Sequence, residues 1–251
     1  MGIYRHILKK YLSAILVCGA LYNTAQAAVV MTGTRIIFSA NQNEKTIQFQ
    51  NKDNNTNMVQ IWLDSGDTES TPETADAPFF ANPQIFKIGP SQGQIVRLIF
   101  SGDKSSLPTD RESLFYFNFS EIPSIKSGYA DKNKLMLVFK NRVKVFYRPI
   151  NLSIGSNEIS KYISYKFVQE NNSDAIELKN NSPYYANLSE VELIQGNQKK
   201  VLKRNTMLAP FSSVVWSLDQ TNLNPENTKL KLGIMNDFGV TVFSEVNNNE
   251  R

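Results

Sequence analysis

Cysteine and histidine, the residue types that most often supply nucleophiles, proton relays and soft-metal ligands, each occur once in this 251-residue sequence. Both of them, Cys18 and His6, lie within the first 27 residues. If that segment is removed, the remaining chain has no thiolate and no imidazole, which excludes Cys–His and Ser–His–Asp catalysis and a zinc site of the usual type. The spacing of its carboxylates and glycines predicts neither a paired-carboxylate site nor a phosphate loop. We therefore expect no enzymatic activity, no catalytic residue, no metal and no cofactor.

The first 27 residues have the pattern of a cleaved secretory signal. Arg5, Lys9 and Lys10 form a positive region, residues 11–22 are apolar but too few to span a bilayer, and residues 25–27 read Ala-Gln-Ala, a typical cleavage site. Cleavage there would leave an exported, soluble chain with no membrane insertion. Removing three of the 27 Lys and Arg leaves 24 against 23 Asp and Glu. The pI of about 9.0 therefore does not indicate nucleic-acid binding.

Residues 133–149 are predicted to form one long β-strand that ends at Pro149. Its apolar side chains Leu135, Leu137 and Phe139 are spaced two residues apart and share one face. A strand of this length that ends at proline indicates a structural edge. Natural proteins normally protect edge strands, because the unpaired N–H and C=O groups of an edge recruit other chains. An apolar edge without such protection therefore favours pairing with a partner. In the alternative interpretation, these three side chains face the protein's own core.

Other short segments of alternating hydrophobicity are separated by clusters rich in Asn, Asp, Ser, Gly and Pro. The predicted strands are residues 34–38, 46–50, 58–63, 94–100 and 114–119 in the first half, and residues 162–169, 175–178, 186–194, 213–218, 229–235 and 240–245 in the second. No stretch of about 12 or more residues has a helical period. This pattern predicts an all-β fold of two tandem immunoglobulin-like β-sandwich domains. We place the signal at residues 1–27 and the two domains at 28–148 and 149–251.

Asp53, Asn55, Asn57 and Asp64 imitate part of a calcium loop, but Met58 stands where glycine is needed and no helices flank the segment. Asp64, Asp67 and Glu69 form an acidic cluster in the turn-rich segment that follows. We expect these three side chains to lie in a solvated loop.

Six fragments of the chain carry a resemblance to a known family. They are residues 34–38 (Thr-Arg-Ile-Ile-Phe), 108–118, 121–123 (Glu-Ile-Pro), 143–149 (Val-Lys-Val-Phe-Tyr-Arg-Pro), 181–185 (Asn-Ser-Pro-Tyr-Tyr) and 236–239 (Asn-Asp-Phe-Gly). In this order and spacing, the chain resembles the PapD-like periplasmic chaperones of the chaperone–usher pathway, which assemble pili. The lack of a cysteine pair and the modest length of residues 125–133 resemble the short-loop subgroup.

This resemblance implies a non-enzymatic periplasmic chaperone that binds pilus or fimbrial subunits and delivers them to an outer-membrane usher without ATP. The binding mode would be donor-strand complementation, in which the chaperone lends an edge strand to an incomplete subunit sandwich. Leu135, Leu137 and Phe139 would fill the subunit's apolar groove.

In the family, a basic pair in the interdomain cleft binds the subunit's C-terminal carboxylate and so sets the register of the donated strand. Arg35 and Lys144 occupy the matching positions. Lys144 has the opposite parity from Phe139 along the strand. A twist or bulge near Asn141 could reconcile the two.

The family also has an interdomain salt-bridge set, which by position would be Glu112, Arg148 and Asp237. A buried set of this kind favours a fixed orientation more than net stability. Two other functions remain open. An exported tandem immunoglobulin-like adhesin or pilus structural subunit is the first, although a subunit would be a single incomplete sandwich, commonly with a cysteine pair. An exported hydrolase is the second, and the missing His and Cys count against it.

Overall fold

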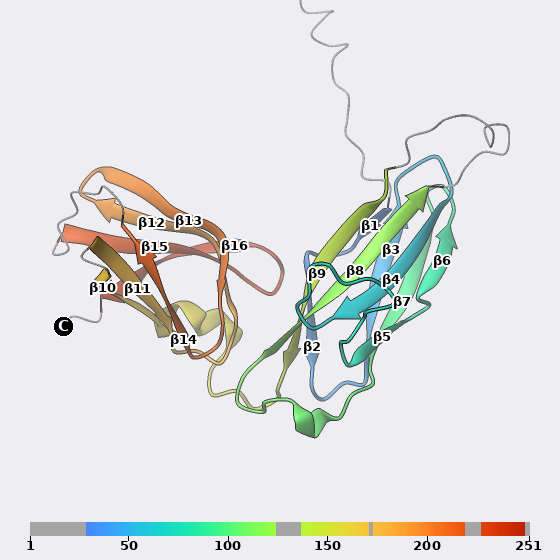
Figure 1. Cartoon of the computed structure of the whole chain (residues 1–251), viewed down its shortest axis with the longest axis horizontal. Coiled ribbons are helices and arrows are strands. Elements are labelled where there is room, and N and C mark those ends of the chain that lie inside the picture. The colour runs from blue at the N-terminus through green and yellow to red at the C-terminus, as the bar shows by residue number, and fades with distance from the viewer. Residues whose placement is uncertain (1–28, 124–136, 171–172, 219–226, 249–251) are drawn as a thin grey trace, which may run out of the picture.

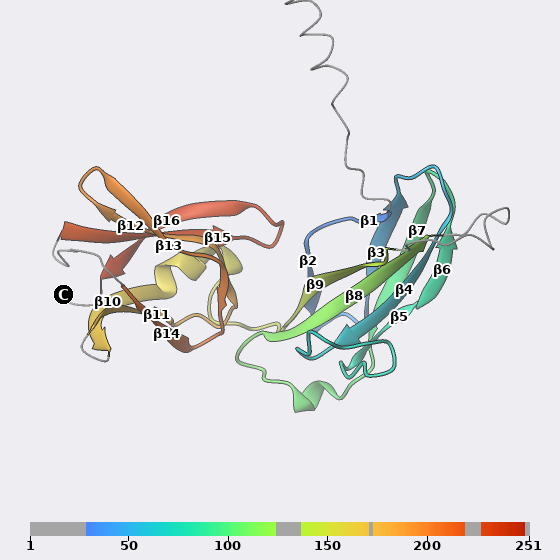
Figure 2. The same cartoon turned by 45° about the horizontal axis from the view of Figure 1, so that its top comes forward.

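The computed structural model describes residues 29–123, 137–170, 173–218 and 227–248, so the predicted signal segment and Leu135 lie outside the described residues. The described chain forms two bodies built almost wholly from β-strands, and it passes from one to the other after β9 (Figures 1 and 2). The predicted fold of two tandem β-sandwiches is confirmed. In the described part of the chain, no helix has the length and hydropathy that a membrane crossing requires.

The first sandwich packs a four-stranded sheet on a five-stranded sheet. The four-stranded sheet has the order β1 (Val29–Met31), β3 (Glu44–Asn51), β7 (Gly93–Phe100) and β5 (Phe79–Asn82). The five-stranded sheet has the order β2 (Arg35–Ser39), β9 (Phe139–Arg148), β8 (Ser113–Pro123), β4 (Asn57–Asp64) and β6 (Ile85–Ile88). The short 3-10 helix η1 (Lys104–Ser106) lies between β7 and β8. Alternating apolar residues from both sheets meet in one core, where Phe38, Phe49 and Phe117 are fully buried.

The chain changes sheets directly after β1, and within the described residues this change leaves part of β9 with a neighbouring strand on one side only. β1 pairs with β3 in the four-stranded sheet, whereas β2 pairs with β9 in the five-stranded sheet. Gly33, with φ of 91°, lies between them in a backbone conformation that favours glycine. Because the chain enters the second sheet only at Arg35, its parallel pairing with β9 begins at Lys144.

The second sandwich begins with the 3-10 helix η3 (Ser156–Tyr162). Its strands form one curled sheet in the order β13 (Gln198–Leu208), β12 (Ala186–Gln195), β15 (Thr228–Met235), β16 (Thr241–Asn248), β10 (Ile163–Glu170), β11 (Ser173–Asn180) and β14 (Ser212–Ser217). Two residue pairs between the parallel strands β10 and β16 connect its two halves. The halves face each other across a core that includes the fully buried Leu178, Leu188 and Leu230.

Four strands are absent from the sequence prediction. β1, β5 and β6 have three or four residues each, too few for a period to show. β13 is an outer strand in which Lys199, Lys200, Lys203 and Arg204 are all exposed. These charges interrupt the alternation of apolar and polar residues by which a strand is predicted. Charged side chains commonly protect an edge strand from pairing with other chains.

Candidate functional site

The first half of β9 is a one-sided edge. Phe139 to Tyr147 pair continuously with β8, with Phe139 opposite Glu121. On the other side, β2 covers only Lys144 to Arg148. Within the described residues, Phe139 to Val143 therefore have a neighbouring strand on one side only, and their outward N–H and C=O groups are available to another chain.

On the face that continues the first core, the exposed edge is apolar apart from Asn141. Val143, Val145 and Tyr147 belong to or pack against that core. Since side chains alternate along a strand, Phe139 lies on the same face. Phe139 is 65% exposed and Leu137, just before the strand, is 59% exposed. The row of core side chains thus continues beyond the protein's own sandwich into solvent.

The cations of β9 lie on the opposite face. The β8–β9 pairing has no register shift, so Asn141 is not bulged and Lys144 keeps the opposite parity from Phe139. A bulge near Asn141 therefore does not reconcile the two parities. The two groups lie on different faces of one strand: the apolar row at its free end, and Lys144 toward Asn187 of the second domain.

Arg35 and Lys144 are register partners on the parallel strands β2 and β9. Lys144 Nζ donates to Asn187 Oδ1 on β12 at 2.7 Å, and Arg35 Nη1 donates to the Met235 carbonyl on β15 at 3.2 Å. Arg35 Nε is buried and has no hydrogen-bond partner among the described residues. The structure thus brings these two predicted residues together where the domains meet, with an unused donor on the arginine.

Both cations carry an electrostatic cost in the free protein. Burial lowers the pKa of Lys144, and the neighbouring Arg35 charge lowers it further. Burial also lowers the pKa of Arg35, although the carboxylates of Asp237 and Glu112 partly offset this. A bound carboxylate would relieve the cost by pairing with both charges.

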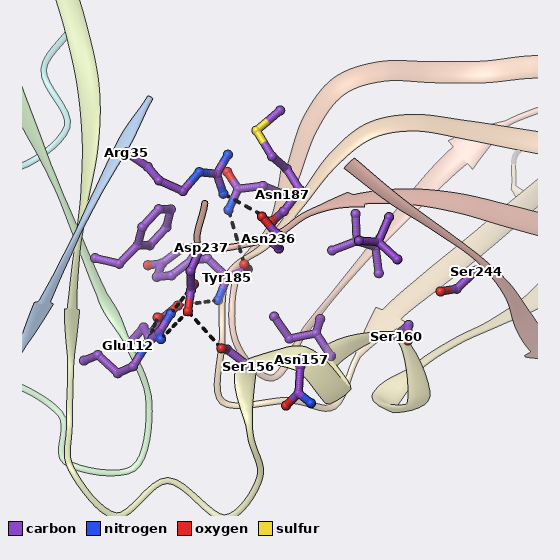
Figure 3. Close-up of a pocket in the computed structure, with 16 residues that line it drawn as sticks. Arg35, Glu112, Ser156, Asn157, Ser160, Tyr185, Asn187, Asn236, Asp237 and Ser244 are labelled. Atoms are coloured by element: carbon purple, nitrogen blue, oxygen red, sulfur yellow. Dashed lines mark hydrogen bonds and ion pairs between the residues drawn. The ribbon is translucent and has the colours of Figure 1, made fainter. Parts of the chain in front are cut away.

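Arg148 connects the domains through two carboxylates. Its Nε donates to Glu112 Oε1 at 2.8 Å, and its Nη1 and Nη2 bind the two oxygens of Asp237 at 2.7 Å each. Ser156 Oγ donates to Asp237 Oδ2 at 2.9 Å, as Figure 3 shows. Glu112 also accepts the Tyr185 N–H at 2.9 Å. The three predicted salt-bridge residues therefore lie together between β9, the segment before β8, and the β15–β16 hairpin.

These contacts also set the charge balance of the cleft. Burial opposes the charge on Arg148, but Asp237 and Glu112 outweigh it and raise the pKa of the guanidinium. Burial raises the pKa of Glu112, because one guanidinium shared with Asp237 does not fully compensate it. Burial alone would raise the pKa of Asp237, but the hydrogen bonds from Arg148 outweigh this effect and the pKa is lowered. Together with Arg35 and Lys144, these side chains make three cations and two carboxylates, which leaves one positive charge.

A cavity of about 240 Å³ opens beside this network, and we call it the cleft pocket. Arg35 and Glu112 border it from the first domain. From the second domain, η3 and the β15–β16 hairpin line it together with Tyr185 and Asn187 (Figure 3).

An ion pair that sequence analysis missed holds the outer face of β9. Asp64 is fully buried, and Arg142 binds both its oxygens, Nη1 to Oδ2 at 2.6 Å and Nη2 to Oδ1 at 2.7 Å. Asn118 and Ser70 also donate to Oδ2, at 2.6 and 2.8 Å. The prediction of a solvated loop is therefore wrong for Asp64, because the last side chain of β4 turns inward beneath the loop that follows it.

Lys140 extends the same contact along the strand. Its Nζ donates to the carbonyls of Thr68 at 3.0 Å and Ser70 at 2.8 Å. Lys140 and Arg142 thus fasten the 65–70 loop to the free half of β9, which lacks a second neighbouring strand among the described residues. Cations at every second position of a strand indicate acidic or carbonyl partners on that face, and this pattern could have located the contact.

We expect Asp64→Asn to lower the free energy of unfolding by about 2 kcal/mol at neutral pH, because Arg142 loses its charged acceptor. Burial raises the pKa of Asp64, but the hydrogen bonds from Arg142, Asn118 and Ser70 outweigh it, so the pKa is lowered overall. A carboxylate with a lower pKa in the folded state stabilises fully above its unfolded pKa, and this stabilisation is lost as the pH falls through the folded pKa. The difference between wild type and variant should be constant above about pH 5 and shrink below about pH 4.

Denaturant unfolding across this pH range measures the effect. Glu69→Gln, an exposed neighbour on the same loop, is the control and should change the free energy of unfolding by less than about 0.5 kcal/mol. A wild-type advantage over Asp64→Asn that persists undiminished to about pH 2 would show that the ion pair is not its source.

Comparisons with known proteins agree along most of the chain. Residues 28–153 match the family described as pili and flagellar-assembly chaperone, PapD N-terminal domain, and residues 159–245 match pili assembly chaperone PapD, C-terminal domain. The chain is 32% identical over 224 residues to the probable fimbrial chaperone YadV of Escherichia coli K12, which covers 88% of this chain and 90% of YadV. It is 34% identical over 223 residues to the chaperone protein FimB/FhaD of Bordetella pertussis Tohama I, with 88% of each covered. A crystal structure of the YadV chaperone superposes with a TM-score of 0.73 at 31% identity, over 88% of this chain and 99% of that one.

Proposed function

The chain belongs to the PapD-like family of pilus-assembly chaperones, and from that premise we propose how it works: in the periplasm, as a non-enzymatic chaperone that caps the grooves of fimbrial subunits and delivers them to an outer-membrane usher. Its fimbrial-chaperone relatives and its two matched domains support subunit binding. The predicted signal segment supports the compartment. Delivery to an usher rests on the family alone.

The observation that carries the proposed mechanism is the one-sided edge of β9. An incomplete subunit sandwich lacks a strand and exposes an apolar groove, and an edge strand with free main-chain groups and an exposed apolar row can complete it. The free half of β9 has both properties: among the described residues, the main-chain groups on its outer side have no neighbouring strand, and Phe139 is exposed together with Leu137 just before the strand. Leu135 would continue the row by its spacing, but it lies outside the described residues.

Arg35 and Lys144 supply the register in this proposal. Because side chains alternate, a slip of one residue would turn the apolar row away from the groove. A chain terminus is a unique point on the subunit, so a carboxylate held by two cations fixes the donated strand relative to it. The one positive charge left among the five charged cleft residues matches a single carboxylate.

The Glu112, Arg148 and Asp237 set has an orienting role in this proposal. Arg35 and Lys144 come from the first domain, whereas their acceptors Asn187 and Met235 come from the second. The distance between these donors and their acceptors therefore depends on the angle between the domains. The bidentate contact from Arg148 to Asp237 spans the joint and favours one angle.

Periplasmic co-expression with candidate subunits from adjacent genes tests the function. We expect a subunit to be degraded when produced alone, and to accumulate and co-purify with this protein when both are produced. A cytoplasmic version of the same protein without residues 1–27 is the control for compartment and should protect nothing. Subunit levels that do not depend on this protein for any candidate would favour the rival function, an exported adhesin or structural subunit.

A further inference from the structure

The cleft pocket extends well beyond what a carboxylate anchor needs. Arg35 lies at one end of it, and Ser160 and Ser244 lie at the other (Figure 3). Between these ends, η3 and the β15–β16 hairpin form opposite walls. A carboxylate held at Arg35 would therefore occupy only the mouth.

The walls between the two ends are mainly apolar, although Asn157, Asn236 and Asp237 also line the pocket. Ile159 from η3 and Ile234 from β15 are largely buried and face the cavity, while Val242 from β16 is 52% exposed although it lines the cavity. An apolar occupant would cover this exposed apolar surface, and removing such surface from water is favourable. The far end differs in character, because the hydroxyl groups of Ser160 and Ser244 make no hydrogen bond to any described residue.

The size of the pocket fits one large side chain. A cavity of about 150 Å³ is known to accommodate benzene. The cleft pocket, at about 240 Å³, has room for a leucine, methionine or aromatic side chain, whereas glycine or alanine would leave it nearly empty. The pocket thus has a mainly apolar middle and, at its end, two hydroxyl groups without a hydrogen-bond partner among the described residues.

The orientation of Arg35 connects the mouth to the anchor. Its Nη1 is already bonded to the Met235 carbonyl, and its buried Nε has no partner among the described residues. The Nε–Nη2 edge of the guanidinium is the edge that binds a carboxylate with two parallel hydrogen bonds. Because Arg35 lines the cleft pocket, a carboxylate held on this edge would place the side chain of its own residue at the mouth of the pocket.

We propose that the cleft pocket binds the side chain of the subunit's C-terminal residue and selects subunits in which this side chain is large and mainly apolar. The inference rests on the proposed function, because it requires the terminal carboxylate to sit at Arg35 and Lys144. It adds a specificity element: the cations recognise a terminus, and the pocket distinguishes one terminus from another.

The test uses fluorescein-labelled ten-residue peptides of alternating apolar and polar residues that differ only in ending with Gly, Leu or Phe. Each is made as a free acid and as an amide, and binding to the full mature chain is measured by fluorescence anisotropy. We expect the Leu and Phe acids to bind about tenfold more tightly than the Gly acid. We expect each acid to bind more tightly than its amide.

The outcomes separate the two levels of the proposal. Equal affinities of the Gly, Leu and Phe acids, with the acid preference intact, would overturn the pocket inference and leave the anchor standing. Equal affinities of acids and amides, or no binding of any peptide, would contradict the proposed function itself. A preference for Leu and Phe that is as large in the amides as in the acids would mean that the pocket takes apolar groups without reference to a terminus, and the inference would again be wrong.

Two substitutions that fill the pocket from opposite walls complete the test. Ser160→Leu and Ser244→Leu should each reduce the advantage of the Leu and Phe acids to within about twofold of the Gly acid. Ser173→Leu, on an exposed position of β11 away from the pocket, should retain the tenfold preference. Circular dichroism and thermal unfolding establish that each variant is folded. If both filled variants are folded and keep the full preference, the terminal side chain binds elsewhere.

Discussion

Replacing Lys144 or Arg35 with methionine is expected to weaken subunit binding by about 2–5 kcal/mol for each change, which is roughly 30-fold to several thousand-fold. Methionine keeps an apolar stem and removes only the charge and the donors. The subunit's carboxylate would then be held by one cation in a partly desolvated cleft. Periplasmic co-purification should show loss of the complex, and titration with a purified subunit should give the affinity.

The same substitutions are expected to leave the free protein as stable as wild type or slightly more stable. Burial lowers the pKa of both cations, and each lies beside another positive charge. Loss of binding without loss of stability would separate an anchoring role from a structural one, because a structural cation would lower the melting temperature when removed. Arg97→Met is a matched control, since Arg97 is half exposed and its ion pair with Glu44 lies on the surface.

Alkaline pH offers a second readout of the anchor. The pKa of Lys144 is lowered in the free protein, and a bound carboxylate would raise it. The affinity for the subunit should then be highest below the pKa of free Lys144 and fall as the pH rises above that pKa. Lys144→Met should lack this fall. If both methionine variants capture subunits at wild-type levels, the anchor proposal is wrong.

Sequence reasoning succeeded where the chain repeats a simple pattern. Strands such as β3, β7 and β14 alternate between more and less exposed residues over at least six positions, so their existence follows from periodicity alone. The pairing of Arg35 with Lys144 is different, because 109 positions separate them and parallel pairing across that distance has no local signal. It could be anticipated only through the resemblance to a family.

The least predictable features depend on which strand lies beside which. The sequence interpretation made residues 133–149 an edge along their whole length, yet β9 lies between β2 and β8 from Lys144 onward. The edge exists because Val29–Met31 pair with β3 in the four-stranded sheet and not with β9. Nothing in these three residues indicates that the chain changes sheets after them. Asp64 was mistaken for a solvated residue for the same reason, since its partner Arg142 comes from a strand 78 positions later.

Leu137→Asp and Phe139→Asp are each expected to eliminate subunit capture. Filling an apolar groove with one large side chain contributes about 1.5–3 kcal/mol, and each variant loses this contribution. Each also places a carboxylate in the groove without a partner, which costs several further kcal/mol or forces the group to become neutral. In periplasmic co-expression, the subunit should fall to the level found without the chaperone.

Val138→Asp is the matched control. Val138 is 51% exposed and lies between the two tested residues, but an extended chain turns its side chain to the opposite face. The three substitutions are similar in exposure and in charge and differ mainly in the face that they present. Since all three side chains are exposed in the free protein, none should change the free energy of unfolding by more than about 0.5 kcal/mol.

The comparison therefore distinguishes a strand that is donated in one register from a strand that is merely apolar. If β9 binds through its main chain with Leu137 and Phe139 in the groove, Val138→Asp should retain most of the capture while the other two lose it. If all three variants lose subunit capture equally, the segment binds apolar surfaces without a preferred face, and the cations do not set a register. Normal subunit levels with Leu137→Asp would show that the apolar row is not the binding surface, whatever the anchor does.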